Sequence, residues 1–153
     1  MSGRTFGLDV GSKTIGVAVS DPLGMFAQPV ETVQRTGRKA DAARIQAIVT
    51  ERTGDRIVVG LPIRTDGLEG DSAAEARRMA VAIAGVLPEV EVVLIDERYT
   101  TAQAERVLNA GNVRGRKKRK KVVDQIAAVL ILQQWLDRPL GGEIVIPPPQ
   151  EST

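Results

Sequence analysis

Three acidic residues stand in settings where a charged side chain is costly, and any chemistry of this chain would depend on them. Asp9 lies in an apolar stretch between Gly7 and Gly11, Glu97 directly follows a buried-type strand, and Asp124 begins a largely apolar helix. Buried carboxylates are usually paired with a base or bound to a cation. Three carboxylates meeting at one end of a sheet would repel each other, and divalent metal ions would relieve that repulsion. Two such ions, roughly 4 Å apart, are what a two-metal phosphodiesterase uses.

Alternation along the first strand separates bulky residues from small ones. Phe6, Leu8 and Val10 point to one face, while Asp9 shares the other face with glycines. Glycine weakens a strand unless something approaches its backbone closely. We therefore expect the face bearing Asp9 to leave room for a metal ion and a phosphate.

The composition excludes several classes of enzyme. The chain of 153 residues has no histidine and no cysteine, so it has no Ser-His-Asp triad, no thiolate or imidazole zinc site and no cysteine nucleophile. Any metal must be held by oxygen ligands, which favours Mg²⁺ or Mn²⁺. The N-terminus shows no secretion signal, and the apolar stretch 122–132 is shorter than the roughly 20 residues that a bilayer requires. We expect a cytoplasmic protein that does not bind membranes.

The basic residues are concentrated in one strip. Seven of the 21 basic residues lie within residues 114–121, so 14 remain against 19 acidic ones. Such strips bind polyanions or form solvated segments. The strip comprises Arg114, Arg116, Lys117, Lys118, Arg119, Lys120 and Lys121. We expect it to be mobile in the free protein and to bind backbone phosphates.

The order of elements predicts an α/β domain. A hairpin around Gly11–Lys13 and a third strand come first, and helices then alternate with two buried strands. This order predicts a mixed five-stranded sheet, its first three strands antiparallel, flanked by helices on both faces. The domain is expected to span residues 1–138, followed by a Pro-rich tail at 139–153. The expected helices are 38–53, one opening at a capping box of Ser72 and Glu75, 100–111, and 121–136.

Each candidate residue also has a structural interpretation. Asp124 is expected in the first helical turn, where an acid favours the helix dipole without any catalytic role. Asp96 or Glu97 could pair with Arg98, and the pattern leaves open which of the two is a ligand. Lys13 and Arg98 flank acids at strand ends, and Arg64 lies in a loop after a buried strand, where α/β folds place functional loops. All three are candidates for phosphate contacts or are solvated.

Four ordered segments resemble the motifs of one family, the YqgF (RuvX) family of RuvC-like nucleases. They are Phe6–Asp21; Val59-Gly60-Leu61-Pro62 with Asp66-Gly67 and Glu69-Gly70; Asp96-Glu97-Arg98 with Thr100-Thr101; and the basic strip with Asp124, Ala127-Ala128, Ile131-Leu132-Gln133 and Leu136. Ser12, Thr14 and Tyr99 depart from the expected pattern, and none of the three is a carboxylate.

The resemblance implies an RNase H-like fold and phosphodiester cleavage that depends on two Mg²⁺ or Mn²⁺ ions. Matched motif by motif, the catalytic and metal-binding acids are Asp9, Glu97 and Asp124. The family is linked to 5′-end processing of pre-16S rRNA in ribosome biogenesis and to resolution of Holliday junctions. The expected partner is therefore structured RNA or branched DNA, bound by a monomer or homodimer.

Two other functions fit parts of the sequence. Asp9-Val10-Gly11-Ser12 also resembles the first phosphate loop of actin-like ATPases and sugar kinases, which clamp a nucleotide between two lobes, whereas this chain has one. A catalytically silent module could also bind RNA through the basic strip, although retention of all three acids argues against it. Cleavage of branched DNA and of RNA, with Mn²⁺ and with chelator, distinguishes these functions.

Overall fold

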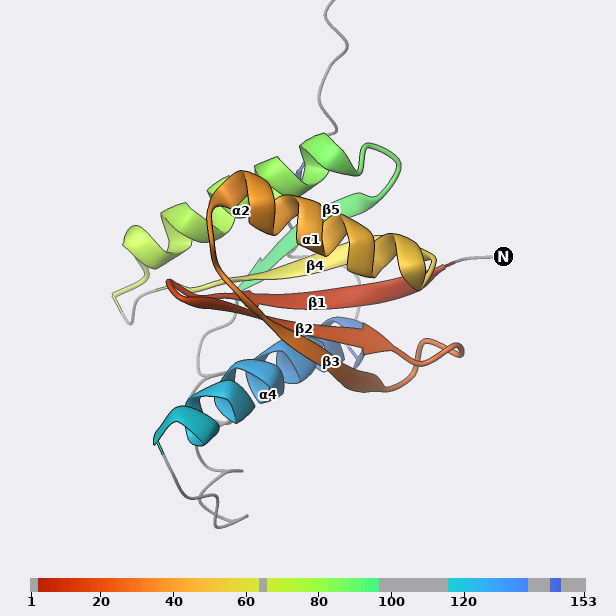
Figure 1. Cartoon of the computed structure of the whole chain (residues 1–153), viewed down its shortest axis with the longest axis horizontal. Coiled ribbons are helices and arrows are strands. Elements are labelled where there is room, and N and C mark those ends of the chain that lie inside the picture. Colours follow the sequence, from red (N-terminus) through yellow and green to blue (C-terminus); the bar gives the residue numbers. More distant parts are fainter. Residues whose placement is uncertain (1–2, 64–65, 97–115, 138–143, 147–153) are drawn as a thin grey trace, which may run out of the picture.

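A six-stranded sheet lies between two layers of helices in the computed structural model (Figure 1). The structure describes residues 3–63, 66–96, 116–137 and 144–146. The strands are β1 (Arg4–Val10), β2 (Thr14–Ser20), β3 (Ala27–Gln34), β4 (Gly54–Leu61), β5 (Glu91–Asp96) and β6 (Ile144–Ile146). The helices are α1 (Arg38–Glu51), α2 (Asp71–Val86) and α4 (Arg116–Asp137).

The sheet has the order β3-β2-β1-β4-β5-β6. The first three strands are antiparallel, and β1, β4 and β5 are parallel to one another, which confirms the predicted mixed sheet. A sixth strand was not predicted: β6 pairs antiparallel with β5, with Val145 opposite Val93. It lies in the expected tail 139–153. Its three residues are too few to show a strand period, so its position follows from pairing with β5.

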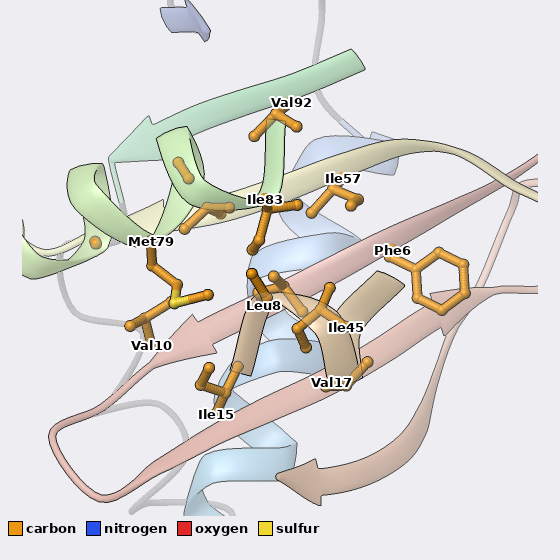
Figure 2. Close-up of a cluster of buried hydrophobic side chains, with 14 of the residues drawn as sticks. Phe6, Leu8, Val10, Ile15, Val17, Ile45, Ile57, Met79, Ile83 and Val92 are labelled. Atoms are coloured by element: carbon orange, nitrogen blue, oxygen red, sulfur yellow. The ribbon is translucent and has the colours of Figure 1, made fainter. Parts of the chain in front are cut away.

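Helices α1 and α2 cover one face of the sheet. The largest cluster of buried side chains fills the space between these helices and the sheet (Figure 2). Phe6, Leu8 and Val10 of β1 all belong to this cluster, which confirms the predicted alternation. Ile45 of α1 and Ile83 of α2 pack against them and are fully buried. Because β4 is covered on both faces, its central residues form a continuous apolar run rather than an alternating one.

Helix α4 covers the opposite face, where the sheet presents small side chains. Ala18 of β2 packs against Ala128 and Leu132. A Cβ added at Gly7 would lie 2.7 Å from the Leu132 Cβ and 2.9 Å from the Ala128 carbonyl oxygen. The room beside Gly7 is therefore filled by α4, so the open space expected on the face of Asp9 does not extend to Gly7.

Two helix starts differ from those predicted. Helix α4 begins at Arg116, so residues 116–121 of the basic strip are helical and Asp124 is the ninth residue, not a first-turn residue. Helix α2 has Gly70 as its N-cap and no side-chain cap, so Ser72 is its second residue and the expected capping box does not form. Glu75 instead accepts hydrogen bonds from arginines. No helix in the described part of the chain is both long and apolar enough to cross a membrane.

Candidate functional site

Asp9 lies near the end of β1, on the face that α4 covers. It is half-buried and stands opposite Gly16 of β2. Gly7 precedes it by two residues on the same face and contacts α4 directly. On the sheet surface, therefore, the nearest neighbours of this carboxylate along and across the strands are two glycines, Gly7, which α4 covers, and Gly16.

The ends of β1 and β5 meet at the same edge of the sheet. Leu8 is level with Val59, and Val59 is level with Leu94, so Asp9 is level with Ile95 one residue further on. One strand, β4, lies between them, which separates the backbones of β1 and β5 by about 10 Å. The strands β1 and β5 thus end on the same side of the sheet with one strand between them.

Alternation along β5 separates its last residues. Ile95 packs with Ile131 of α4 and so shares the face of Asp9, which places Asp96 on the opposite face. The Asp96 carbonyl oxygen accepts a hydrogen bond of 3.2 Å from the Gln134 side chain, and its side chain is exposed. Glu97 and Arg98 lie outside the described residues.

Helix α4 brings Asp124 toward the edge where β1 ends. Gln133, near the C-terminal end of α4, bonds the backbone of Met25 and Ala27 at the β2–β3 turn. The N-terminal half of α4 extends from there toward the opposite end of the sheet, on the side of the β1–β2 turn (Figure 1). Asp124 precedes Ala128, a contact of Gly7, by one helical turn.

The β1–β2 turn that follows Asp9 is held by Arg35. The Arg35 backbone N–H donates to the Lys13 carbonyl (2.9 Å), and its guanidinium donates to the Gly11 carbonyl (3.0 Å). The same guanidinium bonds Asp41 of α1 (3.0 Å) and Glu75 of α2 (2.8 Å). The turn is thereby fixed to both helices, and the exposed Lys13 side chain is presented at the edge where β1 ends.

Two carboxylates balance the buried guanidinium. The Asp41 side chain is 1% exposed and that of Arg35 11%. Hydrogen bonds from Arg35 and then Arg38 lower the pKa of Glu75 to about 2, so Glu75 stays ionised at neutral pH. Sequence reasoning missed this network, because arginines and acids separated by up to 40 residues carry no local pattern that would pair them.

The donor set fits a hard divalent cation. Asp9, the one proposed ligand whose side chain the structure describes, offers carboxylate oxygens in a half-buried, glycine-lined position. Among the described residues, no three acids already form a metal cluster. Arg64 and Arg114 also lie outside the described residues. Arg116, Lys117, Lys118, Arg119, Lys120 and Lys121 form the first turns of α4.

Solved structures share the arrangement of the sheet and helices. RuvC of Thermus thermophilus in complex with a Holliday junction substrate matches with a TM-score of 0.56 and 16% identity, covering 87% of this chain and 92% of that one. A fowlpox virus resolvase in complex with Holliday junction DNA matches with a TM-score of 0.52 and 12% identity, covering 88% and 99%. At these identities the likeness shows the fold, which is the predicted RNase H-like one.

Curated relatives are much closer in sequence. A protein of Myxococcus xanthus, provisionally named pre-16S rRNA nuclease, is 48% identical over 134 residues, which are 88% of this chain and 87% of that protein. A Bradyrhizobium protein with the same provisional name is 51% identical over 136 residues, or 89% and 83%. The family model RuvX, described as Holliday junction resolvase, matches residues 3–138. The chain, with Asp9 at the glycine-lined end of β1, therefore belongs to the RuvX family.

Proposed function

We propose that this protein is a divalent-metal-dependent nuclease that hydrolyses phosphodiester bonds during 5′-end processing of pre-16S rRNA. Relatives of about 48% identity are provisionally named pre-16S rRNA nuclease. The observation that carries the proposal is the position of Asp9, a half-buried carboxylate among glycines, level with the end of β5.

We assign the metal site to Asp9, Glu97 and Asp124. Alternation puts Asp96 on the face away from Asp9, so Glu97, the next residue, is the preferred ligand. Two bound Mg²⁺ or Mn²⁺ ions would activate water and stabilise the leaving oxygen. The side chains named here hold and orient these ions.

Basic residues orient the substrate. Lys13 is exposed on the turn that follows Asp9, and the Arg35 guanidinium fixes that turn by donating to the Gly11 carbonyl. We assign contacts with phosphates near the cleaved bond to Lys13 and Arg98. Arg64 and the basic strip bind the flanking backbone, because lysine and arginine bind phosphate charge rather than base sequence.

A second candidate function is resolution of Holliday junctions. The family description and the RuvC fold favour it. The two functions predict the same acids and differ in the substrate, so one experiment tests both. Labelled pre-16S rRNA with its 5′ leader and a labelled four-way DNA junction are each incubated with Mn²⁺ or with EDTA. Cleavage of the RNA at the mature 5′ end, but not of the junction, supports the first function, and the reverse supports the second.

The acid variants test the site itself. Asp9→Asn, Glu97→Gln and Asp124→Asn should each abolish cleavage, because each preserves shape and removes a metal-binding charge. Asp96→Asn is the matched control and should retain cleavage. Loss of cleavage in Asp96→Asn with retention in Glu97→Gln would move the ligand to Asp96.

Metal binding gives a readout that does not depend on cleavage. Mn²⁺ at about 100 times its Kd should stabilise the wild type by about 2.7 kcal/mol, which thermal unfolding detects. Asp9→Asn should lose this stabilisation and unfold in EDTA at the wild-type temperature or above, because carboxylate repulsion falls. RNA binding by a wild type that shows neither cleavage nor Mn²⁺ stabilisation would identify a silent binding module.

A further inference from the structure

A group of arginines lies on the side of the molecule opposite α4. Arg38 begins α1 and Arg78 lies in α2, and both donate to the same oxygen of Glu75, at 3.0 and 3.3 Å. Their side chains are 44% and 56% exposed. Beside them is a shallow hollow of about 410 Å³, lined by Arg38, Arg77, Arg78, Val81 and Ala82.

The acids in this group cannot neutralise its outer arginines. Glu75 gives its other oxygen to the buried Arg35 (2.8 Å), which also pairs with Asp41. Three guanidinium groups therefore share two carboxylates, and both carboxylates already serve Arg35. A guanidinium carries five N–H donors, of which Arg38 and Arg78 each need one for Glu75. Their exposed donors are held in place by a carboxylate that stays ionised at neutral pH, because its pKa is lowered to about 2.

Arg77 differs from its two neighbours. It forms two bonds of 2.7 Å with Glu69, one to each oxygen, and this one-to-one pair leaves no excess charge. This group of three arginines and two acids thus carries one positive charge in excess, shared by Arg38 and Arg78, and a bound anion would balance it. A fork of N–H donors suits phosphate oxygens, which accept two parallel hydrogen bonds.

Arg38 and Arg78 together form what is called the patch below. The patch is connected to the edge where Asp9 lies. Arg35, which shares Glu75 with Arg38, bonds the Gly11 carbonyl in the β1–β2 turn. Asp9, however, faces α4, whereas α1 and α2 pack on the other face of the sheet. The sheet therefore separates Arg38 and Arg78 from a strand whose cleaved bond lies on the α4 face at Asp9. A phosphate at these two arginines is for this reason assigned to the second strand.

We propose that Arg38 and Arg78 bind the phosphodiester backbone of the strand that is not cleaved, so that the protein recognises a double-stranded segment beside the cleavage site. This inference rests on the proposed nuclease function for its substrate, and it adds a second binding surface on the α1–α2 side. The chemistry is that of phosphate bound by exposed, pre-positioned guanidinium groups, without base recognition.

The test compares two double variants with the same reduction in charge. Arg38→Gln/Arg78→Gln removes the patch. Arg44→Gln/Arg52→Gln removes an exposed and a half-buried arginine, which pair with Glu31 and Glu51 elsewhere on the surface. Binding is measured by fluorescence anisotropy in EDTA, with an RNA hairpin stem and an unpaired RNA of equal length. The patch variant should bind the stem about tenfold more weakly at low salt, and its log–log salt slope should fall by about 0.9 for each phosphate that is no longer neutralised. The control variant should bind both RNAs like the wild type.

Two further variants separate charge from folding. Arg38→Lys/Arg78→Lys keeps the charge without the fork of donors and should restore part of the affinity for the stem. Val81→Glu adds an acid to the hollow without touching Glu75, since Val81 is exposed, and should weaken binding of the stem alone. Thermal unfolding verifies that each variant is folded.

The inference would be overturned if the patch and control variants bound the stem with equally reduced affinity. It would also be overturned if the patch variant lost affinity for the stem and the unpaired RNA to the same extent. Its failure is distinguishable from that of the proposed function. Mn²⁺-dependent cleavage with wild-type binding by Arg38→Gln/Arg78→Gln refutes the patch alone. Patch-dependent binding of the stem without cleavage of either substrate refutes the nuclease function alone.

Discussion

Gly7 shows how closely α4 approaches the sheet. A methyl group at this position would overlap the Leu132 Cβ and the Ala128 carbonyl oxygen, so Gly7→Ala should destabilise the protein by about 1–3 kcal/mol. Gly85→Ala is the control, because nothing lies within 4 Å of its added methyl, and it should stabilise α2 by up to about 1 kcal/mol. Urea denaturation measures both. Equal stability of Gly7→Ala and wild type would mean that α4 shifts freely on the sheet.

Glu75 should make stability depend on pH in the acid range. Its pKa is held at about 2, below the ordinary value of 4.5, by Arg35 and then Arg38. A lowered pKa stabilises the folded state above pH 4.5, and this contribution is lost as the pH falls toward 2. Glu75→Gln should therefore lower the free energy of unfolding at pH 7 by about 1–3 kcal/mol, and the difference from wild type should shrink at low pH.

Urea denaturation at pH 7 and at pH 3 measures this difference. The exposed Glu89→Gln is the control and should leave the free energy of unfolding unchanged at both values. A Glu75→Gln variant equally destabilised at every pH down to 2 would show that the charge of Glu75 contributes nothing and that only its packing matters.

At the residue scale, the sequence predicted the face of a strand on which a side chain lies better than it predicted what that face contacts. The alternation of Phe6, Leu8 and Val10 identified the face of Asp9 correctly, because a strand's period is fixed by its backbone. The same pattern misjudged what fills the space at Gly7, since the packed helix lies more than 100 residues away in sequence. Only a three-dimensional structure could show that contact.

At the element scale, the start of α4 is the main difference from prediction. The expected helix began near residue 121 because its apolar residues begin there, whereas α4 starts with Arg116. Six consecutive cations, Arg116–Lys121, carry no apolar period, so a pattern of buried positions could not detect them. Cations also oppose the dipole at a helix N-terminus.

The unfavourable interaction of these cations with the helix dipole offers a way to test whether the basic strip binds polyanions. Polyanions should neutralise the cations and raise helicity in the first turns of α4, so circular dichroism at low salt should show a gain when RNA or heparin is added. Replacing Lys117, Lys118, Lys120 and Lys121 with Gln should remove most of this gain, weaken binding to RNA and DNA alike and flatten the salt slope. Cleavage at saturating substrate should change much less. Unchanged binding and slope would show that substrate enters elsewhere.

At the scale of the whole molecule, the proposed site is assembled from distant parts of the chain. Asp9 comes from the first strand, Asp124 from the last helix, and the turn between β1 and β2 is fixed by an arginine that reaches both α1 and α2. The order of the elements from β1 to β5 was predictable, because hairpins and βα units impose their own pairing. The strand β6 was not predicted, and the expected helix 100–111 lies outside the described residues. The Arg35 network was not predictable, because it joins the β1–β2 turn to α1 and α2 through polar groups that lie far apart in the sequence.

The strand β6 covers the edge of β5, so a chain shortened before β6 should aggregate more readily. It pairs with β5 through Val92, Val93 and Leu94, whereas the family match ends at residue 138. A chain ending at Arg138 would keep every proposed catalytic acid and still expose the backbone donors and acceptors of an apolar strand. Such bare edges add strands from other molecules, so we expect concentration-dependent aggregation that binds thioflavin T. Restoring residues 139–146 should suppress it, and a shortened chain that stays monomeric at high concentration would show that β5 needs no cover.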